Sequence, residues 1–418
     1  MESVMKAFIG TNIIDVKTES ILQDQVIIVD GPSIAQIIPS AESSNLNLDS
    51  MEEIYDVSGL TVLPGLIDCH DHLASKNYEL ISRWNLDEPA STNSIRIYKV
   101  LEDTLQSGYT TIRDAGGLDA GYKLAIEEGL CEGPRLVLAI SIMSQTGGIG
   151  DRVSGSGHTN GLVTNPMLPN AVVDGPDEII HKLRELVRCG ADVIKIATTG
   201  GASSRKGLGP RDTSFSRSEV RLIIDESARL NKKVMCHALG GPGLRVCIEE
   251  GVHSIEHGCH LEEDPDLVKI MAEKNVFFVP TFTVYDYHKS HSAPHVQVRA
   301  QQLIDQHRRS FEIAMKEGVK IVAGTDAGGF IHGDNAHELE LLVVNGMTPM
   351  EAIKAGTITA AECLEIDDCV GSIEVGKVAD MIIVDGDPLK NISMLRDRNN
   401  IKHVIKDGKN IPISKRIL

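Results

Sequence analysis

The chain reads Pro64-Gly65-Leu66-Ile67-Asp68-Cys69-His70-Asp71-His72 at the point where a short apolar run ends in polar residues. Residues 66–70 have the length and composition of a buried strand. Side chains at positions i and i+2 of a strand point to the same side, so His70 and His72 are placed to hold one metal ion together. This stretch predicts a strand whose carboxyl end carries metal-binding side chains.

Short β runs and helix-length amphipathic stretches alternate through the middle of the chain, which is typical of parallel βα units. The predicted strands are 66–70, 110–113, 135–140, 193–196, 233–237, 254–257, 276–280 and 320–325. The predicted helical stretches include 177–189, 218–230, 243–250, 264–273 and a helical region at 336–364. Eight such units with right-handed crossovers close most simply into a TIM barrel.

The two ends of the chain alternate short β runs with turns and lack this βα pattern. Each end alone is too small to bury a core, so we expect both ends to form one small β-sandwich domain. The expected fold class is α/β, a distorted (β/α)8 TIM barrel with a small β-sandwich domain built from both termini. The expected domains are residues 1–62 and 365–418 for the sandwich and residues 63–364 for the barrel.

Composition narrows the class of partner. The formal net charge of −18 argues against nucleic acid, whose phosphates need a basic face. No apolar run approaches the roughly 20 residues of a membrane span, and the start of the chain shows no secretory signal pattern. The eight cysteines form no CxxC pair, which favours a reduced, cytoplasmic protein. We therefore expect a small-molecule substrate, no nucleic acid and no membrane, with a homo-oligomer left open.

Further ligand-type residues follow other predicted strands. His237, His257 and Asp326 lie at strand ends, where barrel enzymes keep their active sites, and Lys195 lies within the fourth strand. Each has a structural explanation when taken alone: a hydrogen-bonded histidine, a helix-capping aspartate or a buried ion pair. If those explanations held for every residue, all of these side chains would have converged on one barrel mouth by chance. A shared metal site explains their positions together. Four imidazoles and one carboxylate also suit Zn²⁺ and its neighbours.

Lys195 requires a chemical step of its own, because an ammonium group has no lone pair for a metal. Burial among β-branched neighbours would lower its pKa and yield some free amine. Free amine reacts with CO₂ to give a carbamate, an anion whose two oxygens are able to bridge two metal ions. We infer this chemistry from the residue type; the spacing does not show it.

Several motifs together resemble a known family. They are residues 64–72 as quoted above, Val193-Ile194-Lys195-Ile196, Cys236-His237-Ala238, Ile255-Glu256-His257-Gly258, Gly324-Thr325-Asp326-Ala327 and the segment 371–380. This ordered set resembles the amidohydrolase superfamily over nearly the whole chain. Residues 110–117, 144–148 and 280–286 are similar to its prolidase-like branch. That branch includes Xaa-Pro dipeptidases, carboxypeptidases acting on C-terminal Arg or Lys, and ochratoxinase-type amidohydrolases.

The resemblance implies a role for each ligand. Two divalent metal ions, with zinc the expected species, would be held in a binuclear centre. One metal would bind His70, His72, Asp326 and the Lys195 carbamate, and the other would bind the same carbamate, His237 and His257. A metal-bridging hydroxide would attack an amide bond of a dipeptide or N-acyl amino acid, with Asp326 as general base and acid. Tyr285 would donate a hydrogen bond to the oxyanion or to a substrate carboxylate.

One departure from the branch bears on the substrate. A histidine usually follows the Thr-Gly-Gly segment in the branch, and Ile149 stands there in this chain. Isoleucine removes a polar contact and adds apolar wall, which favours a less carboxylate-like or more hydrophobic substrate. Other candidate substrate contacts are Arg205 and Arg211 in the loop after the fourth strand, and His332 after the eighth. His288, His291 and His295 lie in a polar segment that we expect to be a lid or surface loop.

Alternatives stay open at this stage. The same scaffold would also suit a hydrolase of aryl amides, carbamates, ureas or lactones, or a decarboxylase. A non-catalytic barrel binding protein is the alternative from another class, although such proteins usually lose ligands that are all present here.

Overall fold

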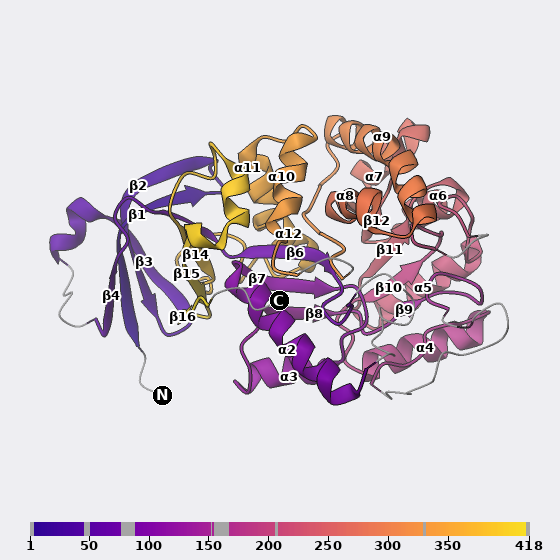
Figure 1. Cartoon of the computed structure of the whole chain (residues 1–418), viewed down its shortest axis with the longest axis horizontal. Helices are drawn as coiled ribbons and strands as arrows, with labels where there is room; N and C mark the ends of the chain where they lie inside the picture. Colours follow the sequence, from indigo (N-terminus) through magenta and orange to yellow (C-terminus); the bar gives the residue numbers. More distant parts are fainter. Residues whose placement is uncertain are drawn as a thin grey trace.

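Strands from the two ends of the chain share one mixed sheet. The computed structural model describes residues 4–45, 51–76, 88–151, 153, 167–204, 208–328 and 332–414. Its largest sheet has the order β16 (Lys409–Ile411), β15 (Ile401–Lys406), β14 (Met381–Val384), β5 (Thr61–Pro64), β1 (Met5–Asp15), β2 (Ser20–Asp30) and β3 (Ser33–Pro39), and β4 (Glu53–Asp56) pairs with β1. Figure 1 shows it at one end of the molecule. The two ends of the chain therefore assemble together, and a division into two sandwich layers stays a prediction.

The middle of the chain forms parallel strands in two sheets. The first contains β6 (Leu66–Asp71), β7 (Tyr109–Asp114) and β8 (Arg135–Leu138). The second contains β9 (Ile142–Met143), β10 (Ile194–Ala197), β11 (Val234–Ala238), β12 (Ser254–His257) and β13 (Phe277–Val279). The amides of Asp192 and Val193 donate to the Leu138 carbonyl, which links the two sheets on one side. Strand pairing in register brings the carboxyl ends of neighbouring strands together.

Helices cover the parallel strands, and their sequences explain where several of them begin. Figure 1 places α2 and α3 on one side of β6–β8 and α10–α12 on the other. At the start of α5, Ser216 and Glu219 form a reciprocal capping box that satisfies two backbone amides. The helices are α2 (Ala90–Gln106), α3 (Ala120–Glu127), α4 (Pro176–Arg188), α5 (Arg217–Arg229), α6 (Gly241–Glu250), α7 (Pro265–Glu273), α8 (Phe282–His291), α9 (Pro294–Lys316), α10 (Ala336–Val344), α11 (Pro349–Ala355) and α12 (Ile358–Leu364).

The segment predicted as the eighth strand, 320–325, is not a regular strand in the structure. This segment lies between β13 and β6, and its successive residues form hydrogen bonds with one neighbour and then the other. The Val322 amide donates to the Phe278 carbonyl of β13, and the Cys69 amide of β6 donates to the Ala323 carbonyl. Single parallel bridges, Phe278 with Ile321 and Asp71 with Ala327, mark its two ends. The backbone departs from strand geometry at Asp326, whose φ is +54°.

Two further predictions about elements were wrong. The third strand was predicted to reach residue 140 but ends at Leu138, because Ile140 has a φ of +66°. The short β9 follows and supplies the pairing partner for β10. The segment around His288, His291 and His295, predicted as a lid or surface loop, forms the end of α8 and the start of α9, and His288 is buried.

Among the described helices, none combines the length and apolar character needed to cross a lipid bilayer.

Candidate active site

Three predicted ligands from distant parts of the chain lie together. His70 is the penultimate residue of β6, His72 lies just beyond the strand, and Asp326 follows the segment beside them. Asp326 Oδ1 lies 3.6 Å from His70 Nε2 and 3.3 Å from His72 Nε2. One ligand atom from each residue falls within 4.8 Å of the others. Gly324 permits this approach, because a Cβ at that position would lie 2.9 Å from His70 Cβ. Two imidazole nitrogens and one carboxylate oxygen thus surround a space suited to a divalent ion.

His237 and His257 extend this group along the neighbouring strands. His237 lies in β11 and His257 ends β12. Their ring centroids are 4.5 Å apart, and the His257 ring lies 5.1 Å from the His70 ring. His257 has a φ of +74°, and Asp326 also lies in the left-handed region. Such backbone strain in residues other than glycine is concentrated at functional sites.

Hydrogen bonds orient the imidazoles of His70, His72 and His257. The Nδ1 atoms of His70, His72 and His257 lie 2.6, 2.8 and 2.7 Å from Glu256 Oε2, the Gly116 carbonyl and Thr281 Oγ1, respectively. Each bond leaves Nε2 as the nitrogen for a metal, which is the usual arrangement of metal-binding histidines. Burial holds the pKa of His70 and of His257 well below the usual range. Both rings are therefore neutral at pH 7, as a ligand must be.

Lys195 lies in β10 and is only 1% exposed. Its Nζ has no hydrogen-bond partner among the described residues. Burial lowers the pKa of Lys195 to about 8. The positive charge of Lys195 in turn contributes to the lowered pKa of His70 and of His257. A buried, unpaired amine with a lowered pKa has a neutral fraction near neutral pH, and the neutral form is the one that reacts with CO₂. These surroundings fit the predicted carbamate.

A buried polar network behind His70 was not predicted from the sequence. Asp68 accepts from the His70 amide at 2.9 Å, from Thr325 Oγ1 at 2.7 Å and from Asn335 Nδ2 at 2.7 Å. Asn335 Nδ2 also lies 2.9 Å from Asp71 Oδ2. Burial raises the pKa of Asp68 to about 8. The network ties the end of β6 to the segment that carries Asp326.

The predicted substrate contacts are spread around this group. Tyr285 in α8 is buried, and its ring centroid lies 6.2 Å from that of His257. Ile149 is half-buried beside the strand that bears His237: a Cβ on Gly201 would lie 3.8 Å from Ile149 Cδ1 and 3.0 Å from His237 Cε1. Tyr285 therefore lies near His257, and Ile149 lies near His237.

The remaining three candidates are placed differently. Arg211 pairs with Glu263, and its Nη2 lies 3.4 Å from His260 Nδ1. His332 is buried, with Nδ1 3.4 Å from Asp71 Oδ1 and Nε2 3.2 Å from the Ser75 carbonyl. Arg205 lies outside the described residues. Substrate binding by these three residues stays a prediction.

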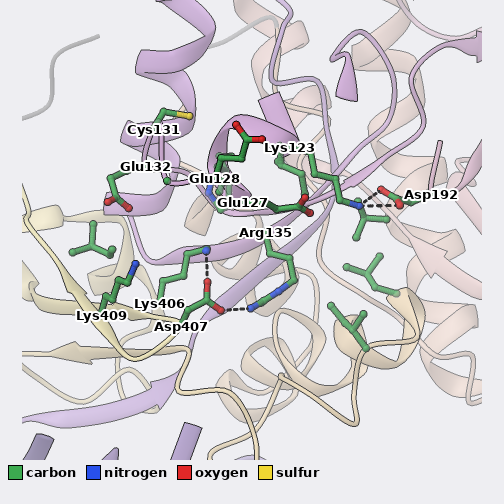
Figure 2. Close-up of a pocket in the computed structure, with 18 residues that line it drawn as sticks. Lys123, Glu127, Glu128, Cys131, Glu132, Arg135, Asp192, Lys406, Asp407 and Lys409 are labelled. Carbon is green, nitrogen blue, oxygen red and sulfur yellow. Dashed lines mark hydrogen bonds and ion pairs between the residues drawn. The ribbon is translucent and has the colours of Figure 1, made fainter. Parts of the chain in front are cut away.

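A cavity of about 730 Å³ lies at the opposite ends of the strands, between α3, the start of β8 and the β15–β16 turn. Figure 2 shows Lys123 paired with Asp192, and Asp407 between Lys406 and Arg135. None of the predicted site residues lines this cavity in the described part of the chain, and most of its cations already have acidic partners. The cavity is therefore separate from the histidine cluster.

Comparison with known proteins agrees with this geometry. Residues 61–411 match the amidohydrolase family. Ochratoxinase from Aspergillus niger is 31% identical over 405 residues, which cover 93% of this chain and 83% of that protein. Among solved structures, a prolidase in complex with N-methylphosphonate-L-proline has a TM-score of 0.89 and 31% identity, covering 98% of this chain and 99% of the prolidase.

A Xaa-Pro dipeptidase with methionine bound in its active site has a TM-score of 0.86 and 32% identity, covering 97% of this chain and 99% of the dipeptidase. These relatives are enzymes, which supports the prediction of a hydrolase over that of a non-catalytic binding protein. The chain belongs to the amidohydrolase family, in its prolidase-like branch, and is a hydrolase acting on C–N bonds.

Proposed function

We propose that this protein is a binuclear metal-dependent amidohydrolase that cleaves the amide bond of a dipeptide or an N-acyl amino acid. The proposal includes a distorted (β/α)8 barrel at 63–364 and a β-sandwich built from 1–62 and 365–418. The hydrogen bonds that join β8 to the start of β10, and those of the 320–327 segment to β13 and β6, support closure of the barrel.

One observation carries the proposal: ligand atoms of His70, His72 and Asp326 converge within 4.8 Å, beside two more histidines and an unpaired buried lysine. We assign one metal to His70, His72, Asp326 and the Lys195 carbamate. The second metal is assigned to the same carbamate, His237 and His257. Zinc is the species that this set of nitrogen and oxygen ligands suits best.

Two divalent ions bound there would supply a water molecule of lowered pKa and polarise the scissile carbonyl. The protein's own groups would do the rest. Asp326 holds an oxygen within the site and would accept the proton of the attacking water, then deliver it to the leaving amine nitrogen. Tyr285, whose ring lies near that of His257, would donate a hydrogen bond to the carbonyl oxygen as negative charge develops there. The buried hydrophobic side chains packed around Tyr285 would limit the entry of water.

The substrate class is proposed from the similar structures. A prolidase binds a phosphonate of proline and a Xaa-Pro dipeptidase binds methionine, so both have sites for an amino-acid unit. We therefore place Xaa-Pro dipeptides and N-acyl amino acids first among the substrates of this chain.

Metal analysis together with a substrate panel tests the proposal. Protein purified with zinc is expected to contain two equivalents per chain and to hydrolyse at least one Xaa-Pro dipeptide or N-acyl amino acid. Removal of the metal by a chelator should abolish turnover, and adding zinc back should restore it. A protein that binds no divalent metal, or that turns over nothing in the panel when fully loaded, would contradict the proposal.

A second candidate, hydrolysis of less polar aryl amides or carbamates, is favoured by Ile149. Its apolar side chain lies near His237, where a polar side chain would suit a substrate carboxylate. Ochratoxinase is among the relatives of this chain, which is compatible with a substrate outside the dipeptides. The ratio of kcat/KM for an uncharged aryl amide to that for its carboxylate-bearing analogue distinguishes the two candidates. A ratio above one favours the second, and Ile149→His should then lower it.

A further inference from the structure

A fully buried ion pair lies directly behind His70. Glu256 Oε2 is 2.6 Å from His70 Nδ1, and Glu256 Oε1 is 3.1 Å from Arg113 Nη2. All three side chains are at most 1% exposed. We propose that Arg113 and Glu256 are positioning residues: Glu256 fixes the His70 ring with Nε2 turned to the metal site, and Arg113 fixes Glu256. This inference rests on the proposed function.

Arg113 reaches across the interior from β7 and joins the two strands that carry His70 and His257. Its Nε donates to the Cys69 carbonyl of β6 at 2.5 Å. Its Nη1 lies 3.3 Å from Ser254 Oγ of β12, and Ser254 Oγ donates to Glu256 Oε1 at 2.5 Å. The Glu256 carboxylate therefore has three donors, and the guanidinium bonds are directed at two strands. A fork of this kind holds a carboxylate in one orientation, which a single flexible cation would not do.

His70 differs from the other oriented histidines in the charge of its acceptor. His72 bonds to a backbone carbonyl and His257 to a threonine hydroxyl, both of which are neutral. Only at His70, among these three, is the hydrogen-bond partner of Nδ1 a carboxylate. A carboxylate fixes the tautomer and raises the electron density of the imidazole, so that it binds a metal more strongly. Loss of this charge should weaken the metal held by His70 far more than the metal held by His257.

The decisive variant is Glu256→Gln, which keeps the shape of the side chain and removes its charge. Metal affinity is measured by competition with a chromophoric chelator, and the ligand field is followed in the visible spectrum of the cobalt-loaded protein. We expect one of the two metal sites to bind about 10- to 100-fold more weakly. We also expect the cobalt absorption bands to shift in position or intensity.

Glu338→Gln is the matched control. Glu338 is also a fully buried carboxylate, and it accepts from the Phe282 amide and from the amide and hydroxyl of Thr283. In the described part of the chain, the hydrogen bonds of its carboxylate go to Phe282 and Thr283, neither of which is a proposed metal ligand. Its substitution should lower thermal stability and leave both metal affinities and the cobalt spectrum unchanged.

The outcomes separate a positioning role from a purely structural one. If Glu256→Gln lowers stability as the control does, but keeps wild-type affinities and spectrum, the inference is overturned. If this variant does not fold, Arg113→Lys replaces it, because lysine keeps the charge and loses the fork. Weaker metal binding by Arg113→Lys supports the inference, and wild-type affinity overturns it. Wild-type protein that binds no metal would instead overturn the proposed function itself.

Discussion

Lys195 is the residue whose proposed chemistry depends most on its surroundings. Its amine is buried, is unpaired among the described residues and has a pKa lowered by burial to about 8. At pH 8 about half of such amines are neutral and able to react with CO₂. We expect metal reconstitution to be slow in CO₂-free buffer and several-fold faster with added bicarbonate. Lys195→Met should show no bicarbonate effect, and an equal rate for wild-type protein in both buffers would argue against the carbamate.

Asp326 combines two proposed tasks, metal ligand and proton carrier. Asn at this position keeps one oxygen but cannot accept the proton, so Asp326→Asn should lower kcat by about 10²- to 10⁴-fold. Metal content measured on the same sample separates the two tasks. A variant that retains both metals and wild-type kcat would remove Asp326 from the proton-transfer step.

The sequence predicted residues for the proposed metal site more completely than it predicted the residues that support them. His70 and His72 were visible because they share one strand face, and Asp326 because it follows a β run. Glu256 and Arg113 were quoted within motifs but received no role, because nothing in the spacing shows that one side chain of β7 reaches β12. Asn335 bonds to Asp68 and Asp71 from a distant part of the chain, and only the folded backbone reveals that contact.

One buried carboxylate, that of Glu338, joins the helices α8 and α10. Glu338 of α10 accepts hydrogen bonds from the first backbone amides of α8, Phe282 and Thr283, where the helix has unpaired donors. Burial nevertheless raises the pKa of Glu338 to about 7 from its ordinary value of 4.5. Its proton is therefore retained in the folded protein over a pH range in which the unfolded chain has lost it.

This difference predicts a pH dependence of stability. The contribution of protonated Glu338 is fully present below pH 4.5 and is lost as the pH rises to about 7. Relative to Glu338→Gln, the wild-type free energy of unfolding should thus fall by about 3 kcal/mol across that window. Urea denaturation of both proteins at several pH values measures it. A constant difference between the two proteins would mean that Glu338 is already ionised at the low end.

Regular elements were easier to predict than irregular ones. Amphipathic period and stop signals located α4, α5 and α7 to within one residue of their ends. α8 and α9 were missed because their polar, histidine-rich boundary resembles a loop, whereas tertiary packing buries His288 and His307. The eighth strand was predicted as regular because residues 320–325 have the composition of a strand. The backbone leaves strand geometry at Asp326, whose φ is positive, where the chain passes close to His70 at Gly324.

Arg135 connects the parallel strands to the mixed sheet. From β8 its Nη1 lies 2.6 Å from Asp380 Oδ2, and its Nη2 lies 2.7 Å from Asp407 Oδ1. Asp380 is almost fully buried, and Asp407 is 41% exposed at its side chain. The two carboxylates therefore depend on Arg135 to different degrees.

Arg135→Met leaves the Asp380 carboxylate buried without its cation. We expect a loss of roughly 2 kcal/mol in the free energy of unfolding, below the usual range for buried pairs because Arg135 is partly exposed. Asp407→Asn, which removes the exposed partner, should cost less than about 1 kcal/mol. Chemical denaturation measures both variants, and equal losses would contradict the difference in burial.

The pairing of β5 with β14 becomes possible only late in synthesis. β5 ends at Pro64, and its partner begins at Met381, so a ribosome must translate the whole set of βα units between them first. Until then the nascent chain presents an unpaired strand edge, a surface prone to aggregation. Chaperone demand should therefore be greatest late in translation, and ribosomes stalled just before residue 381 should carry the most chaperone-bound chains.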